Sequence, residues 1–244
     1  MPAARSFARE SVATRLARLD WEAIEAELWE QGWARTPPVL RPAECRALVA
    51  LWTDDGRFRA RVDMARLRFG VGEYRYFAAP LPPLVAAFRA AAYAHLAPIA
   101  NRWTEALGSG ERFPPDLAAF LARCAAHGQR RPTPLLLRYT AGGYNCLHRD
   151  LYGTVAFPLQ VTCFLGRPGV DYAGGEFLLV EQRPRAQSRA DVVPAEQGAL
   201  VVFPTAGRPA RAPRGVRRFF MRHGVSRITR GERWALGVIF HDAR

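Results

Sequence analysis

The feature that most constrains the fold is a series of short apolar segments that begins after Pro134. These segments are rich in Val, Phe and Leu, and clusters of Gly, Pro and Asp such as TAGGY, RPGVDYAGG and PTAGRPARAPRG separate them. Apolar runs of this length between turn residues are typical of antiparallel strands in a sandwich or barrel. The sequence therefore predicts a β-rich core over residues 133–244.

Residues 1–132 carry helical patterns instead. Apolar side chains recur with the spacing of one helix face from Trp21 to Trp29. An Ala-rich helix is predicted from about Leu84 to Leu107, with Pro98 expected to kink or divide it. We therefore predict an α+β chain, one structural domain overall, in which the helices of residues 1–132 pack on the β-rich core.

The segment NCLHRDLYGTV, residues 145–155, contains His-Arg-Asp, the letters that open the catalytic loop of protein kinases. A kinase also needs an asparagine five residues after that aspartate, a lysine on the ATP phosphates and a downstream Asp-Phe-Gly. Here Val155 occupies the asparagine position, the chain contains no lysine, and Asp-Phe-Gly is absent. These three differences exclude a kinase.

The same segment holds a His-x-Asp pair that suits a metal ion. Residues two apart in a strand point to the same face, so His148 and Asp150 aim at one point. His223, at the end of a later apolar segment, offers a third ligand. Two histidines and one carboxylate leave three coordination positions open, as in non-haem Fe(II) oxygenases. A zinc hydrolase can also use such ligands, but it needs a nearby general base and no anchor for an oxoacid.

Arg233, ten residues after His223, is a candidate for that anchor. The distal carboxylate of 2-oxoglutarate suits the two parallel hydrogen bonds of an arginine fork. The turn TRG separates the two residues, so we expect the Arg233 strand to run back beside the His223 strand. Tyr139, on the strand that precedes His148, is expected to donate its hydroxyl to the same cosubstrate.

The order of these motifs resembles the Fe(II)/2-oxoglutarate-dependent dioxygenases, over about residues 134 to 242. The matching positions are Arg138-Tyr139, Gly142 to Tyr144, His148-Arg149-Asp150, Gly174-Gly175-Glu176, Gly198, Phe203-Pro204, His223-Gly224-Val225 and Arg233. The stretches YNCLHRDLYG, FPLQV and GGEFLLVEQRPRAQSRADVVP are similar to a bacterial subfamily of oxygenases described as acting on alkylated, damaged nucleic acid.

The resemblance implies a double-stranded β-helix (jelly-roll) core that uses Fe(II), 2-oxoglutarate and O2 to hydroxylate a substrate C–H bond. It implies that His148, Asp150 and His223 hold the iron and that Arg233 holds 2-oxoglutarate. Hydroxylation of an N-methyl group releases formaldehyde, so the expected activity is oxidative demethylation of DNA or RNA bases. Two alternatives stay open: a protein or small-molecule hydroxylase, which the ten-residue spacing to Arg233 favours, and a non-catalytic nucleic-acid-binding module.

The net charge of +13, with arginine as the only strongly basic residue, gives the chain a field that attracts phosphates. Arg183, Arg185 and Arg189 are candidate substrate contacts, together with Asn145 and Tyr152 beside the metal pair. Eight further arginines from Arg208 to Arg230 form either a basic rim for an acidic substrate or a solvated loop face.

Two further patterns bear on the environment of the chain. Its four cysteines, which lack C-x-x-C spacing, are expected to be reduced, mostly buried thiols of a cytoplasmic protein. We expect no membrane partner, because no apolar run approaches the ~20 residues of a membrane helix. A second His/Asp pair, His241 and Asp242, is expected to end the last strand near solvent.

Overall fold

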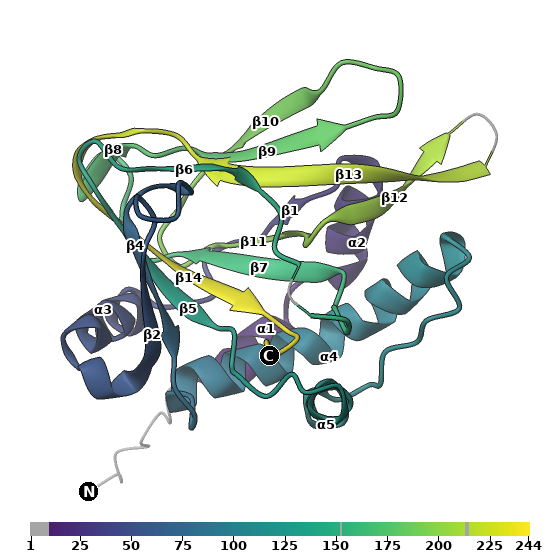
Figure 1. The fold of residues 1–244 in the computed structure, drawn as a ribbon, viewed down its shortest axis with the longest axis horizontal. Helices are drawn as coiled ribbons and strands as arrows, with labels where there is room; N and C mark the ends of the chain where they lie inside the picture. Colours follow the sequence, from purple (N-terminus) through teal and green to yellow (C-terminus); the bar gives the residue numbers. More distant parts are fainter. Residues whose placement is uncertain (1–9, 152, 213–214) are drawn as a thin grey trace, which may run out of the picture.

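The larger of two antiparallel sheets organises the computed structural model, which describes residues 10–151, 153–212 and 215–244 (Figure 1). Its strand order is β1-β11-β7-β14-β5-β4-β2, and β8 pairs with β14. The strands are β1 (Ala34–Arg35), β2 (Phe58–Asp63), β4 (Glu73–Phe77), β5 (Leu135–Thr140), β7 (Leu159–Phe164), β8 (Tyr172–Gly174), β11 (Leu200–Pro204) and β14 (Ile228–Ile239). The predicted combination of helices with antiparallel strands is confirmed.

The smaller sheet has the order β10-β9-β13-β6-β3, and β12 pairs with β13. Its strands are β3 (Gly70–Val71), β6 (Tyr144–His148), β9 (Phe177–Gln182), β10 (Arg189–Val193), β12 (Gly207–Ala212) and β13 (Gly215–Val225). In Figure 1 this sheet lies above the larger one. The chain passes from one sheet to the other between β5 and β6, between β6 and β7, and between β13 and β14.

The last of these crossings corrects one expectation. The Arg233 strand does not lie beside the His223 strand, because β14 pairs with β5, β7 and β8 while β13 pairs with β6, β9 and β12. After Val225 the chain changes sheets, so the turn TRG lies within β14. Arg233 and His223 therefore line a common pocket from two different sheets.

Helices account for much of the chain before β5, as predicted. They are α1 (Val12–Ala17), α2 (Trp21–Glu30), α3 (Pro42–Ala50), α4 (Pro83–Ala106) and α5 (Leu117–Ala126), with the short 3-10 helices η1 (Leu51–Thr53) and η2 (Asp55–Arg57). Asp20 caps α2, and α4 continues through Pro98 without being divided. This region also contains β1 to β4, which extend both sheets, so it is not wholly helical.

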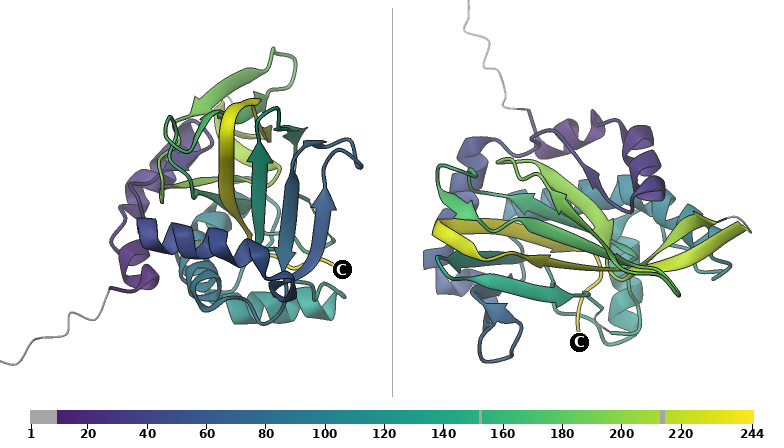
Figure 2. Two further views of the ribbon diagram at one scale, coloured as in Figure 1. Left: turned by 90° about the vertical axis from the view of Figure 1, so that its left-hand side faces the viewer. Right: turned by 90° about the horizontal axis from the view of Figure 1, so that it is seen from above.

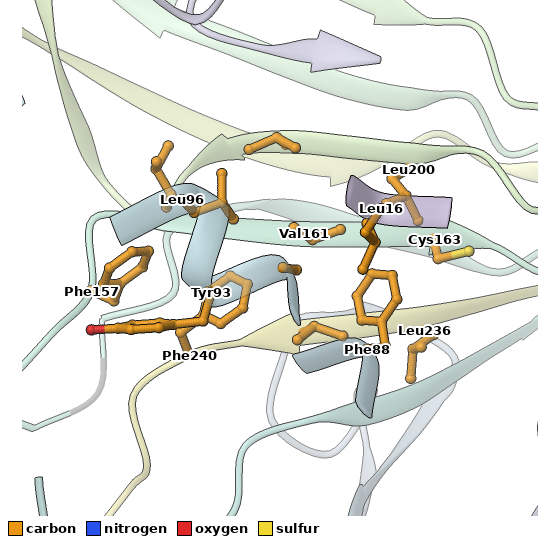
Figure 3. Packing of buried hydrophobic residues seen from close by; sticks show 14 of the residues in the cluster. Leu16, Phe88, Tyr93, Leu96, Phe157, Val161, Cys163, Leu200, Leu236 and Phe240 are labelled. Carbon is orange, nitrogen blue, oxygen red and sulfur yellow. The ribbon is translucent and has the colours of Figure 1, made fainter. Parts of the chain in front are cut away.

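Helices α1, α3, α4 and α5 gather on the side of the larger sheet that faces away from the smaller one (Figures 1 and 2), whereas α2 packs against β1 and β12. Along β7, Leu159, Val161 and Cys163 belong to the same buried cluster as Phe88, Tyr93 and Leu96 of α4 (Figure 3). Burial of each large apolar side chain contributes about 1.5–3 kcal/mol. Alternation along the strand turns the residues between them toward the smaller sheet. Among the described residues, no helix is both long and apolar enough to span a membrane.

Candidate metal and cosubstrate site

Three predicted ligands, His148, Asp150 and His223, lie together between the sheets. His148 ends β6, and His223 is its register partner on β13. Oδ2 of Asp150 lies 3.1 Å from Nε2 of His223, and its Oδ1 lies 3.6 Å from Nε2 of His148. One donor atom from each residue lies within 4.8 Å of the other two. Two imidazoles and a carboxylate at this separation fit a single divalent ion.

Contacts with the surrounding backbone and rings orient these donors. Nδ1 of His148 lies 2.7 Å from the carbonyl oxygen of Cys146, which leaves Nε2 to face Asp150. Such a hydrogen bond fixes the tautomer of a metal-binding histidine. Burial, reinforced by the nearby His223, lowers the pKa of His148 even though Asp150 opposes the shift. The imidazole is therefore neutral near pH 7, the form that binds metals.

Arg233 is the second element of the site, and its guanidinium is buried with only 1% of the residue exposed. Its Nε and Nη2 atoms have no hydrogen-bond partner among the described residues, and no described carboxylate forms an ion pair with it. The rings of Tyr139 and Phe164 lie 5.7 and 5.6 Å away. An uncompensated buried charge costs several kcal/mol. The arrangement therefore fits a bound anion, such as the distal carboxylate of a keto-diacid.

Two buried phenols accompany this guanidinium. The Tyr139 hydroxyl accepts a hydrogen bond of 3.2 Å from Asn145, while the buried Tyr172 hydroxyl has no partner among the described residues. Burial raises the pKa of Tyr139 to about 12, against the opposing charge of Arg233. Burial likewise raises the pKa of Tyr172, again opposed by Arg233. Both hydroxyls are thus protonated at neutral pH and can donate to a carboxylate.

One pocket connects Arg233, Tyr139 and Asn145 with the triad, which consists of His148, Asp150 and His223. It also contains residues that the sequence interpretation missed: Tyr74, Tyr76, Arg149, Gln160 and Thr162. Gln160 and Thr162 alternate with apolar residues along β7. This alternation is the sequence pattern that could have identified them as pocket residues. Tyr172 lies in a segment interpreted only as a turn, so no pattern marked it.

The other proposed substrate contacts lie away from this pocket. Arg183, Arg185 and Arg189 are exposed on the β9–β10 hairpin and do not line the pocket. Arg183 forms an ion pair with Glu181 at 2.7 Å, and Arg189 pairs with Asp191 at 3.5 Å. A role for this hairpin would therefore be to contact a large substrate outside the pocket. Tyr152 and Arg214 lie outside the described residues.

Arg208 is not part of the exposed basic rim that the sequence predicted. It is only 1% exposed and pairs with the buried carboxylate of Glu181. Its Nη1 also donates to the Trp29 carbonyl at 2.9 Å, so it joins β12 to the end of α2. Arg211, Arg217, Arg218, Arg227 and Arg230 are exposed, as expected of a rim.

The prediction that His241 and Asp242 end the last strand near solvent is wrong. His241 is fully buried and Asp242 is 8% exposed. The backbone N–H of Phe157 donates to Nδ1 of His241 at 3.1 Å. Asp242 pairs at 2.8 Å with Arg89 of α4, against which the C-terminal segment folds. Three of the four free cysteines are buried, as predicted, and Cys146 is exposed.

Comparisons with known proteins agree with this geometry. Residues 72–243 match the model of the Oxygenase-NA family, described as an oxygenase catalysing oxidative methylation of damaged DNA. The chain is 47% identical over 181 residues to the proteins MT2286 and Rv2227 of Mycobacterium tuberculosis strains CDC 1551 and H37Rv. These matches cover 72% of this chain and 78% of each relative.

Solved structures share the fold at low identity. A Pseudomonas putida prolyl-4-hydroxylase superposes with a TM-score of 0.54 at 18% identity, covering 92% of this chain and 99% of that one. An oxidoreductase of the 2OG-Fe(II) oxygenase family from Burkholderia pseudomallei gives a TM-score of 0.54 at 17% identity, covering 93% of both chains. The architecture of sheets and helices is therefore one that known oxygenases also adopt.

Proposed function

The chain belongs to the Oxygenase-NA family, and from this premise we propose that it is an Fe(II)- and 2-oxoglutarate-dependent dioxygenase that demethylates alkylated DNA or RNA bases. One observation carries the proposal. A cluster of two histidines and a carboxylate shares a pocket with a buried guanidinium that has no anion among the described residues. Neither the cluster nor the guanidinium alone indicates a particular reaction. Together they suit the binding of a metal ion and a keto-diacid.

The strand order supports a jelly-roll core. The larger sheet contains the run β11-β7-β14-β5, and the smaller sheet contains β10-β9-β13-β6. Eight strands in two facing sheets, with repeated crossings between them, are typical of a double-sheet jelly roll. In this arrangement β6 and β13 carry His148 and His223, while β14 carries Arg233.

The residues of the chain hold and shield the proposed groups. His148, Asp150 and His223 would bind Fe(II), which supplies O2 activation when 2-oxoglutarate is bound. Arg233 would form the ion pair with the distal carboxylate, and the hydroxyls of Tyr139 and Tyr172 would donate to it. On the protein side, the rings of Phe177 and Phe203 lie 5.9 and 4.9 Å from the His223 ring and keep water from it.

A nucleic acid substrate is supported by the family description and by charge. The chain carries +13, and the exposed arginines of the β9–β10 hairpin provide contacts for phosphates outside the pocket. Phosphate contacts position a strand without reading its sequence. A base must then leave the stack to reach a buried metal. The second candidate, a protein or small-molecule hydroxylase, is favoured only by the ten-residue spacing from His223 to Arg233.

The test is turnover of methylated oligonucleotides by the purified full chain with Fe(II) and 2-oxoglutarate. We expect formaldehyde and succinate in equal amounts from at least one methylated single strand, and neither product with Asp150→Ala. Succinate without formaldehyde on every nucleic acid would reject demethylation and favour the second candidate. No succinate at all would reject the oxygenase chemistry.

A further inference from the structure

Gln160 of β7 has a buried side chain whose polar group has no evident structural role. It is 3% exposed, yet it lines the pocket that contains the triad. Its Nε2 has no hydrogen-bond partner among the described residues. A buried amide without a partner costs about 1–3 kcal/mol of stability. An apolar residue at this position would make the fold more stable. The amide is therefore better explained by a hydrogen bond to a bound ligand.

The position of Gln160 separates it from Arg233, the proposed anchor of the cosubstrate. Its register partner on β14 is Ile239, six residues beyond Arg233. At ~3.3 Å per residue, the two positions are about 20 Å apart along the strand. A five-carbon diacid spans only about 6 Å at ~1.5 Å per bond. Gln160 therefore lies at the other end of the pocket from the carboxylate that Arg233 would bind.

The opposite neighbour places Gln160 beside the triad. Its register partner on β11 is Phe203, whose ring lies 4.9 Å from the ring of His223. The pocket around this level is lined by Leu135, Ile239 and the half-buried ring of Tyr76. Apolar and aromatic walls with one amide suit a flat group that carries both a hydrogen-bond donor and an acceptor.

The hydrogen-bonding pattern of the Gln160 amide limits further which ligand group can bind beside it. A glutamine side chain donates from Nε2 and accepts at Oε1 in one plane, so it pairs with a ring nitrogen next to an exocyclic amino group. Adenine presents this pattern at N7 and N6, and a glutamine contact to these atoms is a known base-reading pair. Cytosine methylated at N3 has lost the equivalent ring acceptor, whereas adenine methylated at N1 keeps N7.

We propose that Gln160 is a specificity-determining residue that reads the N7 and N6 edge of a methylated adenine bound beside the metal triad. The inference rests on the proposed nucleic acid function and adds to it the base that is preferred. Arg149, which also lines the pocket and lies over the exposed ring of Phe220 at 4.8 Å, is placed at the protein surface where the strand would enter.

The experiment compares wild type, Gln160→Leu and Gln160→Glu on single-stranded oligonucleotides that carry one 1-methyladenine or one 3-methylcytosine. We expect wild type to prefer methyladenine in kcat/KM. Both variants should lose roughly five- to a hundredfold on methyladenine and much less on methylcytosine. Affinity of the Mn(II)-loaded protein for the same labelled oligonucleotides, measured by fluorescence anisotropy, should follow the same pattern without turnover.

Controls separate base reading from other roles. Gln31→Leu makes the same substitution at the end of α2, away from the pocket, and should leave the preference unchanged. Gln160→Leu should keep an equal or higher Tm, so that a lower kcat/KM does not come from unfolding. Equal losses on both bases, with turnover of both still measurable, would overturn the inference alone. Absence of turnover on every oligonucleotide would overturn the proposed function as well.

Discussion

His223 stands directly opposite His148 in the antiparallel pairing of β13 with β6. This register sets the metal cluster, because a one-residue slip of either strand would turn its histidine to the other face of the sheet. The pairing becomes irregular between His223 and Val225, immediately after the ligand position. The sheet thus fixes two imidazoles, and the segment that follows β6 brings the carboxylate of Asp150 to them.

Replacement of Arg233 tests the cosubstrate anchor. Arg233→Met removes a buried cation that has no partner among the described residues, so the folded chain should be as stable as wild type or more stable. Affinity for 2-oxoglutarate should fall by about 2–5 kcal/mol, the cost of truncating one partner of a buried charge pair. Isothermal titration of the Mn(II)-loaded protein measures this loss. Arg230→Met, at an exposed position of the same strand, is the matched control, and equal affinity in both variants would refute the anchor.

The buried Glu181–Arg208 pair should be essential to stability rather than to catalysis. Glu181→Ala leaves the guanidinium of Arg208 buried without its carboxylate, which should cost about 3–5 kcal/mol of unfolding free energy. Urea unfolding monitored by fluorescence measures the change. A decrease below about 1 kcal/mol would show that water or another group solvates Arg208 in the variant.

The same carboxylate predicts a pH dependence. Burial raises the pKa of Glu181, but hydrogen bonds from Arg183 and the charge of Arg208 outweigh it and hold the pKa below its usual value of 4.5. The stabilisation is therefore complete above about pH 4.5 and is lost as the pH falls through the folded-state pKa. Unfolding free energies measured from about pH 7 to about pH 3 should fall less steeply in Glu181→Gln than in wild type. Parallel profiles would contradict this assignment.

The β9–β10 hairpin should bind phosphates in a salt-dependent way. Arg185→Gln and Arg189→Gln together should weaken binding to all oligonucleotides alike. They should also reduce the slope of log K against log salt by about 1 for each phosphate that the variant no longer neutralises. Titrations at several salt concentrations measure the slope. Arg18→Gln, on the helical side of the molecule, is the control. A slope that equals that of wild type would remove the hairpin from the binding surface.

Local patterns were enough to predict β5, β7, β9, β11, β13 and β14 and the three side chains that lie together at the site. The segments RPGVDYAGG and PTAGRPARAPRG were expected to be turns, and that expectation is wrong for β8 and β12, which lie within them. The spacing within His148-Arg149-Asp150 predicts which side chains share a face of the strand. Arg233 was chosen as the candidate oxoacid anchor because of its guanidinium and its distance in sequence from His223. The pairing of strands that are distant in sequence could not be predicted. The assignment of β13 and β14 to different sheets depends on β5, β6 and β7, and the burial of Asp242 depends on Arg89, 153 residues earlier. Alternation along β7 marks Gln160 as a residue that faces the smaller sheet, whereas no local pattern marks Tyr172. That each buries a polar atom without a partner among the described residues depends on the folded pocket, which no local pattern encodes.

The most direct test of the central claim is anaerobic titration of the full chain with Fe(II) and 2-oxoglutarate, followed by visible spectroscopy. A keto-diacid that chelates Fe(II) gives a charge-transfer band. We expect this band at one iron per chain in wild type, its absence in His148→Ala, Asp150→Ala and His223→Ala, and its appearance only at higher 2-oxoglutarate concentration in Arg233→Met. A wild-type protein that retains no iron and gives no band, or a His223→Ala variant that keeps the full band, would contradict the account.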